Sequence, residues 1–262
     1  MSKSHRVEIP GQRGKIAGIL EIPTAEIRGW MLFSHCFTCS KDLKAIVRIS
    51  RGLADCGWGV LRYDFSGLGG SDGEFAQTNF STNCEDLLAA SNFLSAKYHA
   101  PRFLIGHSFG GASSLAMAQR LPSVLGVIAI AAPSDTYHLA DLLERMDPAI
   151  ANQGAGTVNI GGQSLQIHKQ MVEDFRKHDL RKSVQELQKA LLVFHSPEDE
   201  TVGFYHAIRN ARYDQPTEAT QAGNTIPRTL VALPGSNHLL TNSQRDIPMI
   251  VAIADAWCTR LI

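Results

Sequence analysis

The residues best suited to chemistry lie in the segment 103–111, which reads Phe-Leu-Ile-Gly-His-Ser-Phe-Gly-Gly. An apolar run leads into a Gly-x-Ser-x-Gly pattern centred on Ser108, and small residues at 112–118 continue it as a helix would. Glycines on both sides let the chain turn sharply without a Cβ clash, which leaves the serine hydroxyl exposed at the end of a sheet. This context indicates a nucleophilic serine, and the alternative is an ordinary glycine-rich turn.

A serine hydroxyl needs a base that accepts its proton, and imidazole is suited to this near neutral pH. Among ten histidines, His238 is the best candidate, because it lies in a loop between the last predicted strand and the final predicted helix. Loops at the carboxyl ends of parallel strands meet at one edge of the sheet. We therefore expect His238 to face Ser108; the alternative is a solvated surface histidine.

A third group should orient the base, and an acid is expected after the strand that precedes the His238 strand. Three acids compete there: Glu198, Asp199 and Glu200. We choose Asp199, because the Asp-x-x-Val spacing places the acid at the loop tip while Val202 returns to the core. The chain order Ser, Asp, His is that of α/β-hydrolases.

Two backbone amides should stabilise the oxyanion that forms when the serine attacks a carbonyl. The first is the N–H of Phe109, which follows the nucleophile at a helix N-terminus. The second should come from the loop 35–38, and we assign it to Phe37. Each such donor is typically worth about 10²–10³ in rate.

Elements that would position these residues alternate between strands and helices, after an antiparallel hairpin at the N-terminus. This order predicts a doubly wound α/β fold with a mostly parallel sheet and helices on both faces. We predict strands over residues 6–9, 15–22, 29–34, 58–65, 102–105, 125–131, 191–194 and 229–233, and helices over 42–56, 83–98, 111–120 and 248–261.

The regular alternation is interrupted by an insertion at about 134–189 within a single domain that spans residues 1–262. Helical stretches at 140–146, 170–178 and 180–188 flank two alternating runs around Gly161-Gly162, which is a hairpin signal. An insertion that leaves the carboxyl end of a sheet strand lies where open α/β sheets bind ligands. We expect a cap over Ser108; the alternative is a decorative segment or one that forms a homodimer.

Bulk properties agree with a single globular α/β domain. The chain has 262 residues, 44% hydrophobic and 19% charged, and a formal net charge of zero, so nothing suggests a nucleic-acid or anionic-membrane partner. We see neither an apolar signal segment nor a run near the roughly 18 residues of a membrane span. Five cysteines are too few and too odd in number for a disulfide framework, and a reducing cytoplasm is the expected compartment.

Two other motifs invite different functions. Cys36-x-x-Cys39 could indicate a redox or zinc site, but a second ligand pair is missing, and we expect unpaired, packed thiols. Gly67-x-Gly69 imitates a dinucleotide loop but lacks the third glycine, so we expect a turn in the wall of the site. We expect His107 to pack beneath the serine turn and His206 to lie on the surface.

With these motifs in order, the chain resembles an α/β-hydrolase over nearly its whole length, and Asp64-x-x-Gly-x-Gly-x-Ser71 is similar to a familiar turn of that superfamily. Four segments resemble more narrowly the hydrolase half of bacterial proteins in which an α/β-hydrolase is fused to an OsmC-type peroxide-reducing domain; this chain ends at Ile262, and we expect the hydrolase half alone. Those segments are 34–42, 64–72, 78–80 and 238–241. The resemblance implies the fold, the triad and an esterase-like activity. Cys36 stands where the superfamily commonly has glycine, which would narrow the pocket.

The sequence therefore predicts a serine hydrolase that cleaves small or medium carboxylic esters through an acyl-enzyme, without cofactor or metal. Ser108, His238 and Asp199 form the expected triad. A thioesterase, an acyltransferase or another acyl hydrolase could use the same groups. A non-catalytic ligand-binding protein of the same fold is the alternative from a different class; such proteins often lose a triad member, and here each is present.

Overall fold

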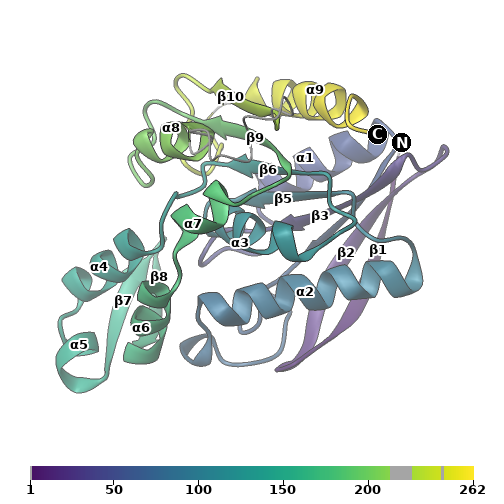
Figure 1. Ribbon diagram of the computed structural model, residues 1–262. Coiled ribbons are helices and arrows are strands. Elements are labelled where there is room, and N and C mark those ends of the chain that lie inside the picture. The colour runs from purple at the N-terminus through teal and green to yellow at the C-terminus, as the bar shows by residue number, and fades with distance from the viewer. Residues whose placement is uncertain (1, 213–225, 243–244) are drawn as a thin grey trace.

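The central element of the computed structural model, which describes residues 2–212, 226–242 and 245–262, is an eight-stranded sheet (Figure 1). The strand order is β1-β2-β4-β3-β5-β6-β9-β10, and the neighbours from β4 to β10 run parallel. Their bounds are β1 (Ser2–Gly11), β2 (Gly14–Pro23), β3 (Gly29–Ser34), β4 (Trp58–Tyr63), β5 (Phe103–His107), β6 (Gly126–Ile130), β9 (Ala190–His195) and β10 (Arg228–Ala232). The predicted fold class is confirmed.

Burial explains the parallel strands. Each residue of β4, β5, β6 and β9 is buried, as expected for apolar runs covered by helices on both faces. The N-terminal hairpin is different: β1 is largely exposed and pairs antiparallel with β2, from Ser2 opposite Pro23 to Gly11 opposite Gly14. The predicted hairpin is thus confirmed, with longer strands than expected.

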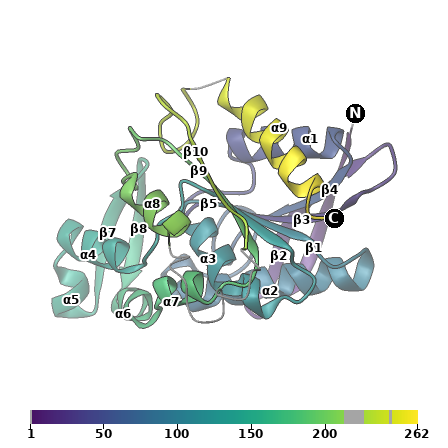
Figure 2. The same cartoon turned by 45° about the horizontal axis from the view of Figure 1, so that its top comes forward.

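Helices form one layer on each face of the sheet, as Figures 1 and 2 show. One layer holds α1 (Lys44–Asp55) and α9 (Asp246–Thr259), and the other holds α2 (Phe80–Lys97) and α3 (Phe109–Met117). Helix α2 begins three residues before the predicted start because Asn79 caps it: its side chain accepts from the Thr82 amide at 2.9 Å, and the Thr82 hydroxyl accepts from the Asn79 amide at 2.9 Å.

The insertion between β6 and β9 forms a small lobe at one side of the sheet (Figure 1). Its hairpin turns at Gly161-Gly162, as predicted, where φ is +59° and +80°. Its elements are α4 (Tyr137–Met146), α5 (Ala149–Gln153), β7 (Ala155–Ile160), β8 (Gln163–His168), α6 (Lys169–Lys177) and α7 (Leu180–Gln185). Helix α5 and the later helix α8 (Tyr205–Arg212) were not predicted from the sequence.

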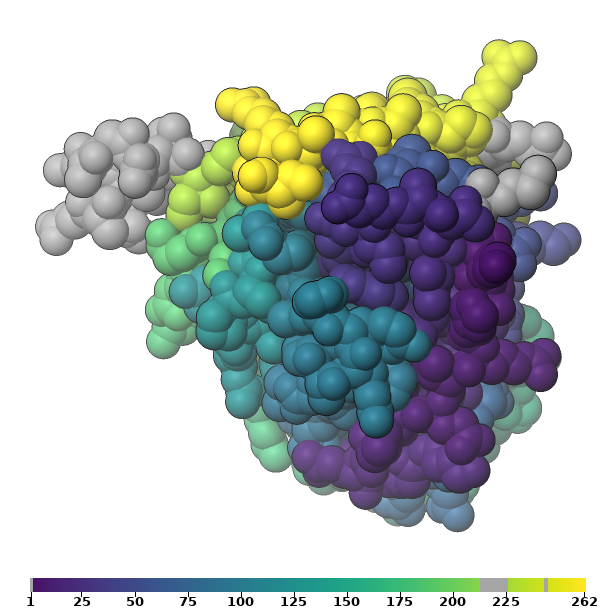
Figure 3. All heavy atoms as spheres, turned by 90° about the vertical axis from the view of Figure 1, so that its right-hand side faces the viewer, coloured from purple at the N-terminus to yellow at the C-terminus, as the bar shows by residue number. Residues whose placement is uncertain are grey.

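The end of the molecule that carries the N-terminal strands is seen in Figure 3, where the purple strands and the yellow helix α9 both reach the surface. The segment before β3 is tied to α9 by Arg28, whose guanidinium lies 2.7 Å from the Asp255 carboxylate. Within the described residues, none of the helices has the length and apolar character required to cross a bilayer.

Candidate active site

Four loops that carry the predicted site residues leave the same edge of the sheet. They follow the carboxyl ends of β3, β5, β9 and β10, and carry Phe37, Ser108, Asp199 and His238 in that order. Because the four strands are parallel members of one sheet, their carboxyl ends must share an edge. The topology alone thus gathers residues that are up to 201 positions apart (238 − 37) in the chain.

Ser108 lies on a strained turn between β5 and α3. Its φ of 52° and ψ of −119° are rare for a residue with a side chain, and the turn is held by the Ser108 N–H, which donates to the Ile130 carbonyl at 2.8 Å. A Cβ at Gly106 would lie 2.3 Å from the Gly110 carbonyl oxygen, and one at Gly110 would lie 2.3 Å from the Ser34 oxygen. These glycines are therefore required by close backbone contacts, and the predicted sharp turn is present.

The structure brings Ser108, His238 and Asp199 together in one hydrogen-bonded chain. Ser108 Oγ lies 2.9 Å from His238 Nε2, and His238 Nδ1 lies 2.8 Å from Asp199 Oδ2. An ionised carboxylate only accepts, so Nδ1 carries the imidazole proton and Nε2 is free to accept from the serine hydroxyl. Ser108 is 8% exposed, so the hydroxyl is largely shielded from water.

Asp199 is held by more than the histidine. Its Oδ1 accepts from the amides of Thr201 and Val202, both at 2.9 Å. Burial opposes its ionisation, but the hydrogen bond and charge of His238 and the two amide bonds outweigh burial and hold the pKa of Asp199 below its usual value. The carboxylate is therefore ionised and fixed in orientation at neutral pH.

The two glutamates that compete with Asp199 in the sequence lie outside this chain. Glu198 is exposed and accepts from the Gly235 amide at 2.9 Å, while Glu200 is exposed on the same rim. Both line a cavity of about 410 Å³ to which residues of the His238 loop, His238 included, also contribute. Of the three acids, only Asp199 contacts His238.

The backbone amides of Phe37 and Phe109 have no acceptor among the described residues, although both lie beside the serine turn. Their rings are in edge contact with centroids 5.3 Å apart, so the two loops are neighbours. His35 orients the first amide: the Phe65 N–H donates to His35 Nε2 at 3.0 Å, so Nδ1 carries the proton and donates to the Cys36 carbonyl at 2.6 Å. In a trans peptide the C=O and N–H point in opposite directions, so the Phe37 N–H points away from His35.

His35 is a residue whose positioning effect the sequence argument missed. It is fully buried, and burial lowers its pKa to about 4, so it stays neutral. A signal was present, since a histidine directly after a buried strand borders the predicted oxyanion loop. The sequence motif likewise predicts only a turn at Asp64. In the structure the Asp64 carboxylate accepts from the Lys41 backbone amide at 2.6 Å and from Lys41 Nζ at 2.7 Å.

Two sequence expectations about polar side chains are wrong. Cys36 and Cys39 are not unpaired thiols but form a disulfide, because the tight turn after β3 brings their Cα atoms to 5.3 Å. His206 is not on the surface but is 1% exposed, because helix α8, which was not predicted, packs it against the loop after β6. His107 does pack beneath the turn as expected, and its Nε2 donates to the His238 carbonyl at 2.7 Å.

The insertion contacts this site through Phe175 of α6. This buried ring packs against both Phe37 and Phe109, with centroid distances of 5.8 and 5.1 Å. The Asp174 carboxylate accepts from both the amide and the hydroxyl of Ser81, at 2.9 and 2.7 Å. The lobe is therefore anchored next to both candidate oxyanion donors.

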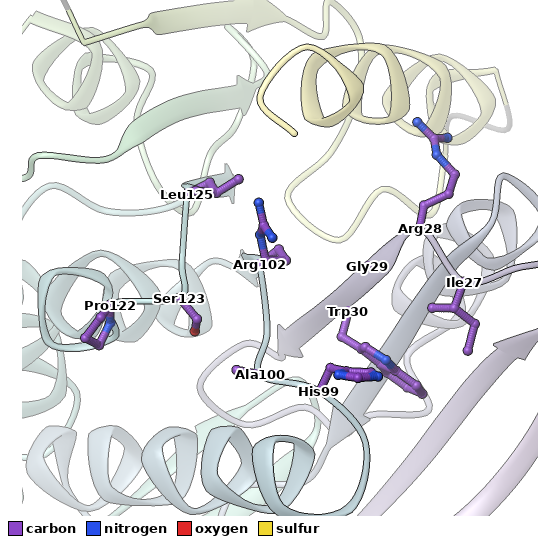
Figure 4. A pocket seen from close by; sticks show the side chains of 10 residues that line it. All are labelled: Ile27, Arg28, Gly29, Trp30, His99, Ala100, Arg102, Pro122, Ser123 and Leu125. Carbon is purple, nitrogen blue, oxygen red and sulfur yellow. The ribbon is translucent and has the colours of Figure 1, made fainter.

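A larger cavity, of about 580 Å³, lies at the opposite edge of the sheet. Its lining comes from the start of β3 and from the segments that lead into β5 and β6, including Trp30, His99 and Arg102 (Figure 4). These are the amino ends of strands whose carboxyl ends carry the candidate site. A molecule bound there could not reach Ser108, so size alone does not identify the active site.

One group of potential metal ligands occurs among the described residues: Asp135, His138 and His206, whose ligand atoms lie within 4.8 Å of one another. Their contacts do not favour a cation. The Ser134 N–H donates to His206 Nδ1 at 3.1 Å, and the Arg209 guanidinium lies 3.7 Å from Asp135. Metal binding at His206 Nδ1 is opposed because this nitrogen already accepts a hydrogen bond. The positive charge of Arg209 near Asp135 also opposes it.

The sheet order, the insertion after β6 and the strained serine turn together define an α/β-hydrolase. The chain belongs to the hydrolase family described as serine aminopeptidase, S33, whose model matches residues 26–183. The protein is accordingly a hydrolase of the serine α/β type.

Several solved structures share this fold. The esterase domain of a Rhodothermus marinus protein is 37% identical, with 98% of each chain covered and a TM-score of 0.76. Est1E from Butyrivibrio proteoclasticus, bound to ferulic acid, is 18% identical over 97% of this chain and 98% of its own, with a TM-score of 0.81. Mouse alpha/beta hydrolase domain-containing protein 10 is 18% identical over 98% and 100%, with a TM-score of 0.77. No curated protein sequence matched the chain.

Proposed function

We propose that this protein hydrolyses carboxylic esters, with Ser108 as nucleophile, His238 as general base and Asp199 as the group that orients the base. The observation that carries the proposal is the continuous pair of contacts of 2.9 and 2.8 Å that joins the three side chains. The 37% identical esterase domain, which matches the chain over nearly its full length, supports an ester as the substrate class.

In the proposed reaction, Ser108 Oγ attacks the acyl carbon while His238 Nε2 takes the hydroxyl proton. The negative charge on the former carbonyl oxygen is stabilised by the amides of Phe37 and Phe109, and Asp199 stabilises the imidazolium. The imidazolium then protonates the leaving alcohol, which departs and leaves an acyl-serine. A water molecule, deprotonated by the same imidazole, attacks this ester, and the acid and free serine are released.

We propose that the insertion forms a cap on the acyl side of this site. The support is the position of Phe175, whose ring packs against the rings of Phe37 and Phe109, the two candidate oxyanion donors. A cap at this position disfavours long polymeric substrates. We therefore expect small or medium acyl groups to be preferred.

A fluorophosphonate probe tests the nucleophile, because it reacts with activated serines. Wild-type protein should be labelled at Ser108, and Ser108→Ala should not be labelled. Removal of a triad serine typically costs on the order of 10⁶ in turnover. Labelling of the alanine variant at the same rate would reject the assignment.

A substrate panel tests the reaction class. It should contain p-nitrophenyl esters of rising acyl length, the matching thioesters, and amino-acid p-nitroanilides, which the family description as aminopeptidase makes the relevant alternative. We expect esters to give the highest kcat/KM. Faster cleavage of the anilides would move the assignment to aminopeptidase, and labelling of Ser108 without turnover on any substrate would favour a binding protein.

A further inference from the structure

The Cys36–Cys39 disulfide encloses Phe37, the residue whose backbone amide is the candidate oxyanion donor from the loop after β3. We propose that this disulfide holds the Cys36–Phe37 peptide in the orientation that oxyanion stabilisation requires, so that reduction of the pair slows the enzyme. The inference rests on the proposed ester hydrolysis. It assigns Cys36 and Cys39 as positioning residues and makes the oxidation state of the pair a control on turnover.

The geometry of the turn explains the effect. The Cys36 carbonyl accepts from His35 Nδ1 at 2.6 Å and from the Cys39 amide at 3.3 Å, and the Phe37 N–H points the opposite way. The hydrogen bond from the Cys39 amide to the Cys36 carbonyl is long and contributes little on its own. The disulfide closes the same turn covalently, with the two Cα atoms 5.3 Å apart, and so restricts rotation of the enclosed peptide planes.

Contacts on either side of the turn do not depend on the disulfide. The Phe37 ring packs against Phe75, Phe109 and Phe175 with centroid distances of 5.5, 5.3 and 5.8 Å. Beyond Cys39, the Lys41 amide donates to Asp64 at 2.6 Å. Ring packing fixes the side chain of Phe37, whereas the preceding peptide plane is held by the hydrogen bond from His35 Nδ1 to the Cys36 carbonyl together with the disulfide. Reduction should therefore leave the fold and the substrate site in place and chiefly loosen the amide donor.

The two sulfurs differ in access. Cys36 is 4% exposed and Cys39 is half-buried at the surface. A low-molecular-weight thiolate would thus attack Cys39 Sγ; the S–S bond breaks, Cys36 leaves as a thiolate and takes a proton. A second external thiol cleaves the mixed disulfide, so the pair gains two electrons and two protons while two external thiols become a disulfide. The compartment expected from the sequence is a reducing cytoplasm, where disulfides are typically catalytic or redox-sensing rather than structural.

The test measures turnover of a p-nitrophenyl ester in glutathione buffers from oxidising to reducing, with thiols counted by alkylation and mass spectrometry on the same samples. We expect kcat to fall about 10- to 100-fold on reduction, less than complete removal of one donor, and KM to change less than about threefold. The fall should follow the loss of the Cys36–Cys39 disulfide as a single two-electron transition.

Two variants make the test specific. The double variant Cys36→Ser/Cys39→Ser should have the low kcat of the reduced enzyme at every glutathione ratio, with a circular dichroism spectrum like that of the wild type. Cys56→Ser, at a half-buried cysteine outside the loop, should respond as the wild type does.

The proposal is overturned if reduced and oxidised protein have the same kcat, if reduction raises kcat, or if oxidised protein contains two free thiols at these positions. Fluorophosphonate labelling of the oxidised protein distinguishes failure of the disulfide proposal from failure of the proposed ester hydrolysis. If the protein is labelled and active, and its kcat does not change on reduction, only the role of the disulfide is disproved. Oxidised protein that is neither labelled nor active disproves the proposed function, and the disulfide proposal falls with it.

Discussion

Replacement of Asp199 by asparagine should reduce kcat on the order of 10⁴-fold, and the structure explains why so small a change has so large an effect. Asp199 Oδ1 accepts two amides at 2.9 Å, from Thr201 and Val202. An asparagine keeps those bonds only if its oxygen takes the Oδ1 position. Its NH₂ group must then point at His238 Nδ1, which lies 2.8 Å from the second carboxylate oxygen in the wild type.

A donor at that position forces the imidazole into the wrong tautomer. Nδ1 would accept from the asparagine, and the proton would reside on Nε2, which faces Ser108 Oγ at 2.9 Å. Nε2 could then no longer accept the serine proton. A loss of 10⁴ corresponds to about 5.5 kcal/mol of transition-state stabilisation, at about 1.36 kcal/mol per factor of ten.

The assay is kcat for p-nitrophenyl acetate, and Glu198→Gln is the matched control. Glu198 is exposed, and a glutamine oxygen can still accept from the Gly235 amide, so kcat should stay within about threefold of the wild type. An Asp199→Asn variant that retains more than a tenth of wild-type kcat would refute the reasoning. An equal loss in both variants would show that the loop as a whole, rather than the Asp199 carboxylate, supports the base.

Three further outcomes are expected. Burial and the neighbouring His238 lower the pKa of His107 to about 3. Between pH 6.5 and about 3, His107 is therefore protonated in the unfolded chain but not in the folded protein. The free energy of unfolding should fall as the pH decreases through that range. In urea titrations His107→Gln should make this slope shallower by up to about 1.4 kcal/mol per pH unit, and an unchanged slope would contradict the argument. Phe175→Ala should lower the free energy of unfolding by about 3–5 kcal/mol because the ring is fully buried, whereas Leu142→Ala, at 38% exposure, should cost less than about 0.5 kcal/mol; similar losses in both would exclude a packing role specific to Phe175. Gly110→Ala should prevent the serine turn from forming, because the new Cβ would lie 2.3 Å from a backbone oxygen, and Gly203→Ala should be tolerated because it meets only an exposed ring; fluorophosphonate labelling of folded Gly110→Ala at the wild-type rate would contradict this.

Local sequence was sufficient for the parallel sheet and for the serine turn. Continuous apolar runs such as 103–105 form a strand buried on both faces whichever neighbours they receive, and glycines at 106 and 110 are needed wherever the chain turns this tightly. The order of strands and helices also placed Asp199 and His238 in loops at one edge of the sheet. These features depend on short-range chemistry and on topology rules that a sequence carries.

Other features depended on contacts between segments far apart in the chain. The orientation of the Cys36 carbonyl requires His35 to be fixed in turn by Phe65, and the burial of His206 requires helix α8 to pack against Ser134 in the loop after β6. The Cys36–Cys39 pairing follows from the curvature of the loop after β3, which spacing alone does not give. Residue types and order thus determined which groups could react, whereas only tertiary packing decided which atoms of those groups face one another, because hydrogen bonding depends on directions that the sequence does not specify.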